Sequence, residues 1–467
     1  MNRYDRQLRL WGKEGQLLLT QSHVCIVGPE SVLLQETIKN LALVGITSFY
    51  WFNELSTENR DSTTNLFYDN LIEDMRPLSP NEISIMKHSI NDWDSVMKNK
   101  PISSMILLCE GQDLDIVLRQ DLGQLQFPVI MSYSRGLYGY IHVKLNEPHF
   151  IIESRPDYEI PSFYLDNPWS ELSQYMESIE IELLDEYSLA QLPYIVLLYK
   201  VLQHLRSSNE TISNKMIKDT LQSWYIKEIN PKGQYDLNFD EAVRYSHLTI
   251  TNTDFVSKLN EVIEYCQHKS LKEHKWNDSY NEFTTTLLQA LSIYLQENNG
   301  NNVLVDGNLP DMESSTKHFG TLQKIFQEKA KTSLMKFKGV VSQVCMSNHK
   351  AIPDNNLITS FYQNVKNIRC IKPSSSTISE FLTNQPQQDH TAILKTLISL
   401  QTNTPNPMSL SQINDKALNL SENYPTSSLL AGLVSEEAIK LITHQYVPID
   451  NTLTYDGINN EMVTGTF

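Results

Sequence analysis

The sequence predicts an α/β fold: a doubly wound, mostly parallel sheet with a large helical insertion. Three observations lead to this prediction. Short apolar strand patterns alternate with helical patterns through the first third of the chain, which is typical of a parallel sheet covered by crossover helices. After about residue 165 helical periodicity dominates, and from residue 426 a helix and a strand return. We therefore expect an α/β domain over 1–165, a mainly helical insert over 166–425, and a return to the α/β domain over 426–467.

The elements of the first third follow from residue type and spacing. Apolar and β-branched runs predict strands, and apolar residues at helical spacing predict helices. The expected strands are His23–Val27, Thr47–Phe52, Ile102–Cys109 and Pro128–Ser132, and the expected helices are Pro29–Val44 and Asp113–Leu125. Proline suits the first position of a helix, so Pro29 is expected to begin the first one. The runs Tyr138–Leu145 and His149–Glu153 predict a β-pair around Asn146-Glu147-Pro148.

The middle and the end of the chain are predicted mainly as helices. Helical periodicity is found in Ala190–Leu205, Ser213–Trp224, Asp254–Cys266, Asn281–Leu295 and Thr321–Lys336. The returning segment is expected to form a helix over Ser427–Thr443 and a strand over Thr452–Tyr455.

Composition and charge limit the classes of function. The chain has 467 residues, with 38 Lys and Arg against 55 Asp and Glu, so its formal net charge is −17. An acidic chain is a poor partner for nucleic acid or anionic lipid, and no apolar run approaches the ~20 residues of a membrane span. None of the five cysteines forms a CxxC pair, which argues against a zinc ribbon and a disulfide framework. We expect an intracellular protein that contacts neither nucleic acid nor membrane and holds no metal.

The turn after the first strand is where an α/β fold of this kind holds phosphate. Three glycines in a G-x-G-x-x-G pattern let the backbone bend tightly and approach the ligand. Here only Gly28 remains, because Glu30 and Leu33 occupy the second and third glycine positions. A carboxylate repels phosphate, although a glutamate near a helix start also simply complements the helix dipole. Both interpretations predict that Gly28, Glu30 and Leu33 form a degenerate loop that binds no nucleotide.

Several short segments resemble the enzymes that activate ubiquitin and ubiquitin-like modifiers. The opening run Tyr4–Gly12 (YDRQLRLWG) is the most specific of them. Further segments are similar to that family's first strand and helix, a later strand pair and its returning helix: VCIVG at 24–28, KNLALVGI at 39–46, SRGLYGYI at 134–141 and GLVSEEAIKLIT at 432–443. The resemblance covers roughly the first 165 and the last 45 residues, and it implies an adenylation-like, Rossmann-type fold.

Two segments of the helical middle, GNLPDMES at 307–314 and QEKAK at 327–331, resemble one branch of the family. That branch is the regulatory subunit of the heterodimeric activating enzyme for Nedd/Rub modifiers. The resemblance implies an obligate heterodimer whose catalytic subunit binds ATP and magnesium, adenylates the modifier and takes it as a thioester. This chain would bind neither cofactor. It would contact the modifier and its conjugating enzyme, and work in the cytoplasm, the nucleus or both.

The remaining site residues are weighed in the light of that resemblance. None of the five cysteines lies in the Pro-x-Cys-Thr-like context of active members, and the segment after the second strand, STENRDS at 56–62, departs from their Asn-x-Asn-Arg-Gln-like pattern. No catalytic residue is therefore expected in this chain itself. Arg6 matches an arginine that reaches the partner's ATP site in related enzymes, where a guanidinium would stabilise phosphate charge in trans. It can equally be a solvated residue on a short helix that docks through Leu8, Leu10 and Trp11.

Alternatives stay open at this point. One is the regulatory subunit of the SUMO-activating enzyme, which a helical middle of this size disfavours. Another is a self-sufficient ATP-dependent adenylating enzyme with an unusual loop. Cys266, His268 and His274 are more simply a surface cluster than a metal site, because a fourth ligand is missing. Cys345 and Cys370 lie near predicted loops and are expected to be accessible, but no nearby base would activate them.

Overall fold

The computed structural model of the chain divides into two compact units. Unit 1 comprises residues 1–155, 272–282 and 368–467, and unit 2 comprises 156–271 and 283–367. The structure describes residues 3–53, 70–78, 82–93, 95–96, 105–109, 128–145, 148–153, 161–206, 212–250, 259–264, 279–297, 304–373, 389–402 and 423–466. The predicted boundaries at 165 and 426 remain a prediction about how the chain is organised.

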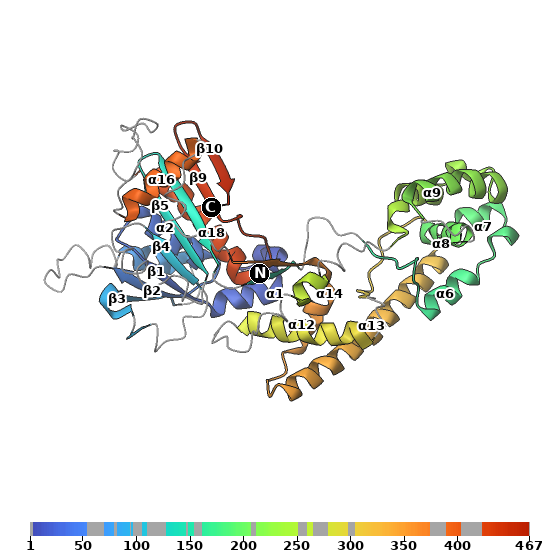
Figure 1. Cartoon of the computed structure of the whole chain (residues 1–467), viewed down its shortest axis with the longest axis horizontal. Coiled ribbons are helices and arrows are strands. Elements are labelled where there is room, and N and C mark those ends of the chain that lie inside the picture. The colour runs from blue at the N-terminus through green and yellow to red at the C-terminus, as the bar shows by residue number, and fades with distance from the viewer. Residues whose placement is uncertain are drawn as a thin grey trace. The chain divides into compact units, whose positions relative to one another are not determined.

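Unit 1 contains an eight-stranded mixed sheet in the order β10-β9-β6-β5-β4-β1-β2-β3 (Figure 1). The strands are β1 His23–Val27, β2 Ser48–Asn53, β3 Ser84–Ser89, β4 Met105–Cys109, β5 Val129–Arg135, β6 Tyr138–Lys144, β9 Thr452–Asp456 and β10 Glu461–Gly465. The strands from β3 to β5 pair in parallel, and the pairs β5–β6, β6–β9 and β9–β10 are antiparallel. The mixed α/β class is thereby confirmed.

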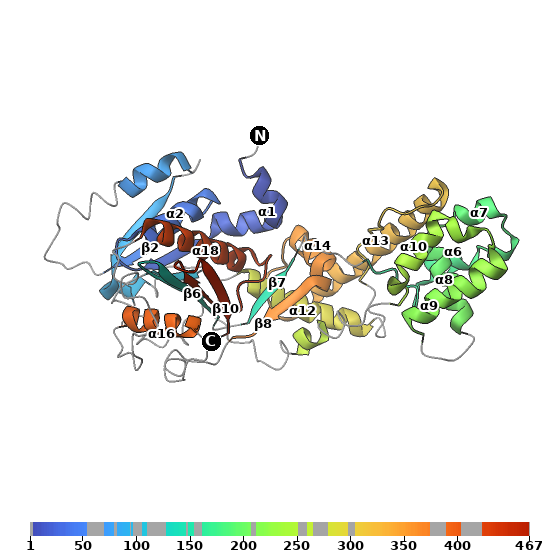
Figure 2. The ribbon, with the colours of Figure 1, turned by 90° about the horizontal axis from the view of Figure 1, so that it is seen from above.

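Helices lie on both faces of this sheet. α2 Val32–Leu43 and α18 Tyr424–Thr443 cover one face together with α1 Asp5–Gln21, and α16 Asp389–Thr402 covers the other (Figure 2). A strand covered on both sides must be apolar almost throughout, which explains why all but the first residue of β1 is buried. Leu34 and Ile38 of α2 and Leu430 and Val434 of α18 belong to the buried core cluster beneath them.

The predicted pairing of Tyr138–Leu145 with His149–Glu153 is wrong. β6 lies between β5 and β9 in the large sheet. β7 His149–Ile152 instead pairs antiparallel with β8 Ile368–Ile371 in a separate two-stranded sheet. The hairpin prediction failed because both strands find partners far away in the sequence, which a local pattern does not reveal.

Helix starts also differ from the predictions. α2 begins at Val32 and not at Pro29, because Ser31 provides the N-cap. α18 begins three residues earlier than predicted, at Tyr424, where the Asn423 side chain accepts a hydrogen bond from the Thr426 N–H at 3.2 Å. β3 and β10 were not predicted. The predicted helix Asp113–Leu125 lies outside the described residues.

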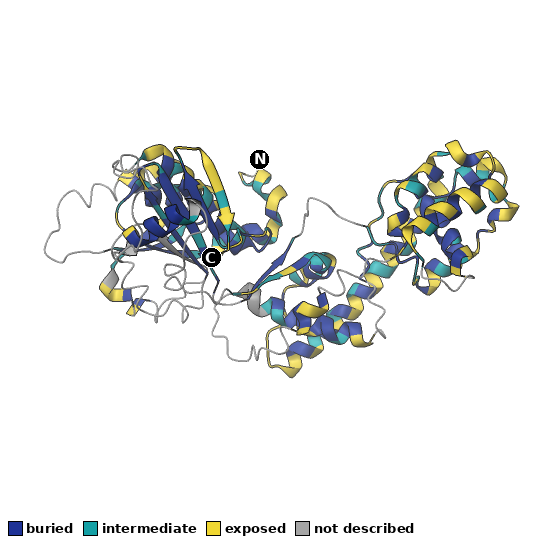
Figure 3. Ribbon diagram, turned by 45° about the horizontal axis from the view of Figure 1, so that its top comes forward, coloured by how far each residue is buried: buried dark blue, intermediate teal, exposed yellow. Residues whose placement is uncertain are grey.

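Unit 2 is built mainly of helices, and its interior is buried along their facing sides (Figure 3). They are α6 Ser170–Glu177, α7 Glu186–Ala190, α8 Tyr194–Arg206, α9 Asn214–Thr220, the π-helical η5 Leu221–Ile229, α10 Leu237–Arg244, α13 Thr316–Ser347 and α14 Asn355–Asn364, with α12 Ser279–Glu297 beginning in the stretch assigned to unit 1. Short 3-10 turns are η1 Arg76–Leu78 and η2 Ile90–Asp92 in unit 1, and η4 Ile181–Leu183, η6 Gly233–Tyr235, η7 Ser246–Leu248 and η9 Val365–Asn367 in unit 2. Four of the five helices predicted for this region are present, with shifted ends, and most of Asp254–Cys266 lies outside the described residues.

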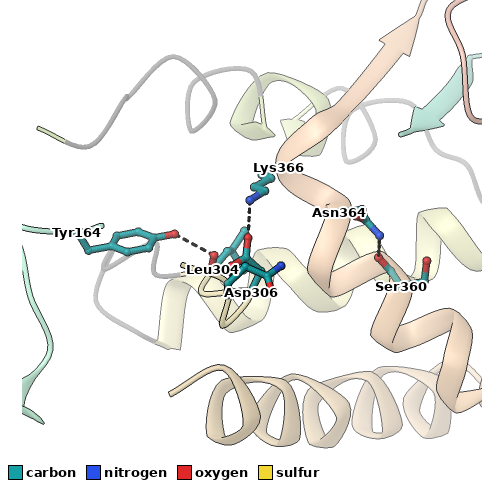
Figure 4. Close-up of polar contacts among 7 residues, drawn as sticks. Tyr164, Leu304, Asp306, Ser360, Asn364 and Lys366 are labelled. Carbon is teal, nitrogen blue, oxygen red and sulfur yellow. Dashed lines mark hydrogen bonds and ion pairs between the residues drawn. The ribbon is translucent and has the colours of Figure 1, made fainter. Parts of the chain in front are cut away.

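The segment that carries the GNLPDMES motif is held by polar contacts within unit 2 (Figure 4). Just before the motif, the Tyr164 hydroxyl donates to the Leu304 carbonyl at 2.9 Å, and Lys366 Nζ lies 2.5 Å from Asp306 Oδ2. Both ionic side chains are largely buried, so breaking this pair would leave an uncompensated buried charge. These contacts hold the chain just before the motif in place.

Candidate functional site

Gly28, at the turn between β1 and α2, is hydrogen-bonded to β2 through its own backbone groups. The Gly28 N–H donates to the Phe52 carbonyl at 3.0 Å, and the Gly28 carbonyl accepts from the Trp51 indole N–H at 2.9 Å. Trp51 is fully buried, so this second hydrogen bond forms away from water. Both polar groups of the one remaining glycine are therefore already satisfied inside the protein.

The N-terminus of α2 is capped by its own chain. The Ser31 hydroxyl accepts a hydrogen bond from the Leu34 N–H at 3.2 Å. A helix N-terminus binds phosphate through N–H groups that lack partners, and this cap engages one of them. Leu33, in the third glycine position, is fully buried in the core of unit 1, where its side chain packs as an ordinary apolar residue.

Glu30 belongs to the same turn. One of its carboxylate oxygens is 4.0 Å from Lys87 Nζ on β3, and that ammonium also lies 4.7 Å from the centre of the Trp51 ring. Burial raises the pKa of the Glu30 carboxyl, and the attraction of Lys87 offsets this rise only in part. The distance to Lys87 is too long for a hydrogen bond, and Glu30 Oε1 has no hydrogen-bond partner among the described residues. The absence of nucleotide binding here nevertheless stays a prediction.

Arg6 lies at the opposite end of α2. It is exposed on α1, and within the described part of the chain its guanidinium makes no ion pair, whereas Arg9 pairs with Asp5 at 2.9 Å. Gln7, its neighbour, donates to the carbonyl of Leu43, the last residue of α2. A helix of 12 residues is about 18 Å long, so the structure does not bring Arg6 and the Gly28 turn together.

The predicted docking of the N-terminal helix is corrected at one residue. Trp11 is buried, with 6% of its surface exposed, and Leu8 is half-buried. Leu10 is 51% exposed and does not dock on the body of unit 1. Leu8 and Trp11 are three residues apart and share a face of the helix, whereas Leu10, two residues after Leu8, lies on another face. The helix also bends at Gly12, whose φ of 72° and ψ of −175° are not helical.

Two side chains that the sequence analysis missed, Gln16 and Tyr446, hold this bent helix in place. The Gln16 amide donates to the Val44 carbonyl at 2.8 Å and accepts from the Trp11 indole N–H at 3.1 Å. The Tyr446 hydroxyl donates to the Leu10 carbonyl at 2.9 Å. The signals that were available are Gly12, which breaks a helix, and Gly45, which ends one and leaves carbonyls to be capped.

Burial limits the chemistry of the described cysteines. Cys25 and Cys345 are buried and Cys370 is half-buried, so the expected accessibility of Cys345 is wrong: it lies inside α13 against the core. Burial raises the pKa of the Cys25 thiol, which disfavours the reactive thiolate. Among the described residues, no group of three or more His, Cys, Asp or Glu is placed to hold a metal ion. Cys266, His268 and His274 lie outside those residues.

None of the described helices has the length and apolar character needed to cross a bilayer.

The relatives found by sequence comparison are similar to this chain along its whole length. No family model matches the sequence. The NEDD8-activating enzyme E1 regulatory subunit of Saccharomyces cerevisiae is 33% identical over 486 residues, covering 99% of each chain. The protein of the same name from Caenorhabditis elegans is 25% identical and covers 100% of this chain and 98% of its own. The regulatory subunit AXL of Arabidopsis thaliana is 24% identical, with 98% of each chain covered.

Among solved structures, one of E. coli MccB aligns at 15% identity with a TM-score of 0.25, covering 31% of this chain and 48% of that one, a likeness too low to carry an argument. The sequence relatives are stronger evidence, because the similarity to the yeast protein spans both chains almost completely. The chain belongs to the family of NEDD8-activating enzyme E1 regulatory subunits.

Proposed function

We propose that this chain is the non-catalytic half of an obligate heterodimer that activates a NEDD8-class modifier. Its catalytic partner would bind ATP and magnesium, adenylate the modifier's C-terminus and take it as a thioester, while this chain binds neither cofactor. Unit 1 would be an adenylation-like, Rossmann-type domain that pairs with the partner through a large apolar interface of above ~2,000 Å². Unit 2 would form a wall of the cleft in which the modifier and, during transfer, the conjugating enzyme are held.

One observation supports this division of labour most directly: the Gly28 turn is occupied by the protein's own groups, whereas Arg6 is exposed about a helix length away. An arginine that served this chain's own turn would lie beside it. An exposed guanidinium on a helix anchored elsewhere is suited to a phosphate group on another subunit, where a planar permanent charge stabilises the transition state.

The test is Arg6→Ala in the co-expressed heterodimer, measured as modifier-dependent ATP–pyrophosphate exchange. We expect exchange to fall at least tenfold, since arginine fingers contribute up to about 10³–10⁵ in kcat, while assembly is unchanged on size exclusion. The matched control is Arg9→Ala on the same helix, because Arg9 is exposed and engaged with Asp5. Equal exchange in wild-type and Arg6→Ala enzymes would remove Arg6 from the mechanism.

The self-sufficient adenylating enzyme is separated from this proposal by titrating the isolated chain with ATP and magnesium. We expect no saturable binding at micromolar concentrations. Saturable binding that is lost when Gly28 is replaced by valine would assign the nucleotide site to this chain. The corresponding SUMO-pathway subunit gains no support from the described residues or from the relatives above. Localisation in the cytoplasm, the nucleus or both, without membrane or nucleic-acid contact, is part of the same proposal.

A further inference from the structure

The N-terminal half of α1 is separated from the rest of the helix by Gly12. Its φ of 72° with ψ of −175° falls in a backbone region that is essentially restricted to glycine. The residues from Asp5 to Trp11 therefore form less than two full turns, a length that is marginal for an isolated helix. Something other than the continuing helix must hold this segment, and with it Arg6, in a defined place.

The end of α2 provides one half of the attachment. Gly45, with φ of 108°, ends the helix, and the N–H groups of Gly45 and Ile46 return to the Ala42 and Leu41 carbonyls at 3.1 and 3.2 Å. This arrangement satisfies earlier carbonyls of the last turn but not those of Leu43 and Val44.

Glutamines from the two sides of the Gly12 bend fill these positions. Gln7 Nε2 donates to the Leu43 carbonyl at 3.4 Å, and Gln16 Nε2 donates to the Val44 carbonyl at 2.8 Å. A side chain at position 45 would place its Cβ 3.0 Å from Gln16 Nε2, so glycine is also what allows this close approach.

Gln16 and Tyr446 provide the other half of the attachment of this segment. Gln16 is only 7% exposed, and its Oε1 accepts from the indole N–H of Trp11, the last residue before the bend. Tyr446, just beyond the end of α18, donates its hydroxyl to the Leu10 carbonyl. In an unbroken helix that carbonyl would accept from the backbone four residues further on, so the tyrosine substitutes for a bond of the kind that the bend interrupts.

We infer that Gln16 and Tyr446 are positioning residues for Arg6: they fix the segment from Asp5 to Trp11 on unit 1 so that the guanidinium is presented to the partner in one place. This inference rests on the proposed role of Arg6. A misplaced charge is costly in catalysis, because stabilisation of a transition state depends on geometry set before the reaction.

The experiment uses the intact heterodimer with Gln16→Met, Tyr446→Phe and both together. Each change removes hydrogen bonds while keeping most of the side-chain volume. We expect kcat for ATP–pyrophosphate exchange to fall by about three- to tenfold for Gln16→Met, the size of one net hydrogen bond, with the KM for modifier unchanged. Tyr446→Phe should have the smaller effect, because its bond is exposed. Thr20→Val is the matched control, since the Thr20 hydroxyl donates only to the Leu17 carbonyl, beyond the bend.

A positioning role makes a second demand that a merely structural role does not. In the Arg6→Ala background, Gln16→Met should lower kcat no further, because there is then no guanidinium to position. Equal fold-losses in the presence and absence of Arg6 would overturn the inference. The inference would also be overturned if Arg6→Ala were impaired while Gln16→Met and the Gln16→Met/Tyr446→Phe variant both kept the wild-type kcat.

Amide hydrogen exchange separates a failure of this inference from a failure of the proposed function. Gln16→Met should raise exchange at residues 8–11 and leave α2 unchanged. Unchanged exchange at those amides overturns the attachment whatever Arg6 does. Raised exchange together with full activity of Arg6→Ala would instead show that the contacts hold the segment but that the proposed function of Arg6 is wrong, and the positioning role would fall with it.

Discussion

The turn at Gly28 and the segment from Asp5 to Trp11, here called the arm, lie at the two ends of α2. The two regions use their polar groups in opposite ways. At the turn, backbone and side chain satisfy one another: Trp51 binds the Gly28 carbonyl and Ser31 caps the helix. At the arm, the protein satisfies the backbone and leaves the charged side chain outside. The difference teaches that one helix can begin at a turn whose polar groups are satisfied internally and still, at its other end, hold a segment whose charged side chain stays exposed.

The largest expected effect tests how firmly the turn is closed. Trp51→Phe removes the indole N–H and leaves the buried Gly28 carbonyl without its partner, in addition to lost packing. We expect the free energy of unfolding of the chain to fall by about 2–4 kcal/mol. Urea unfolding followed by circular dichroism measures it. A loss below about 0.5 kcal/mol would mean that the turn is not held by this bond.

A smaller effect is expected at the helix cap. Ser31→Ala removes the acceptor for the Leu34 N–H and should lower the free energy of unfolding by about 1 kcal/mol. The same urea experiment measures this, and Ser31→Asp serves as the control that restores an acceptor. If the closed turn is needed only for stability, heterodimers carrying Ser31→Ala should keep full adenylation activity. Loss of activity without loss of stability would contradict the assignment of this turn as non-catalytic.

The smallest effect concerns Glu30 and depends on pH. Burial raises the pKa of its carboxyl above 4.5, so the folded state holds a proton more tightly than the unfolded state. Stability is therefore lost as pH rises from about 4.5 through the raised value, and Glu30→Gln abolishes that loss. We expect Glu30→Gln to raise the thermal midpoint at pH 7 and to leave it nearly unchanged at pH 4. A lower midpoint at pH 7 would show that attraction to Lys87 outweighs burial.

Much of unit 1 is predictable from sequence because its strands are local and strongly apolar. The run His23–Val27 is a strand with the predicted ends, since four of its five residues are buried in the core. β10 was missed because its residues are mostly exposed and carry no burial pattern. The pairing of β7 with β8 was missed for another reason, namely that all of unit 2 lies between the two strands in the sequence.

The candidate site was predictable in its residue types but not in its contacts. Missing glycines identified the turn, and a family resemblance identified Arg6. The attachments of the arm were not predictable, because Gln16 and Tyr446 meet their carbonyls only after α1, α2 and α18 have packed together. A glutamine has no sequence signature as a cap for a distant helix, in contrast to Ser31, which caps the helix that follows it.

The position of β6 between β5 and β9 has a consequence for biosynthesis. The ribosome finishes β6 at Lys144, but β9 begins only at Thr452. At about 5–20 residues per second, roughly 300 intervening residues take about 15–60 s to translate. During that time the nascent chain exposes an unpaired strand edge, a template for aggregation. Chaperone depletion should therefore lower the yield of this polypeptide more than that of a protein whose central strands are synthesised consecutively.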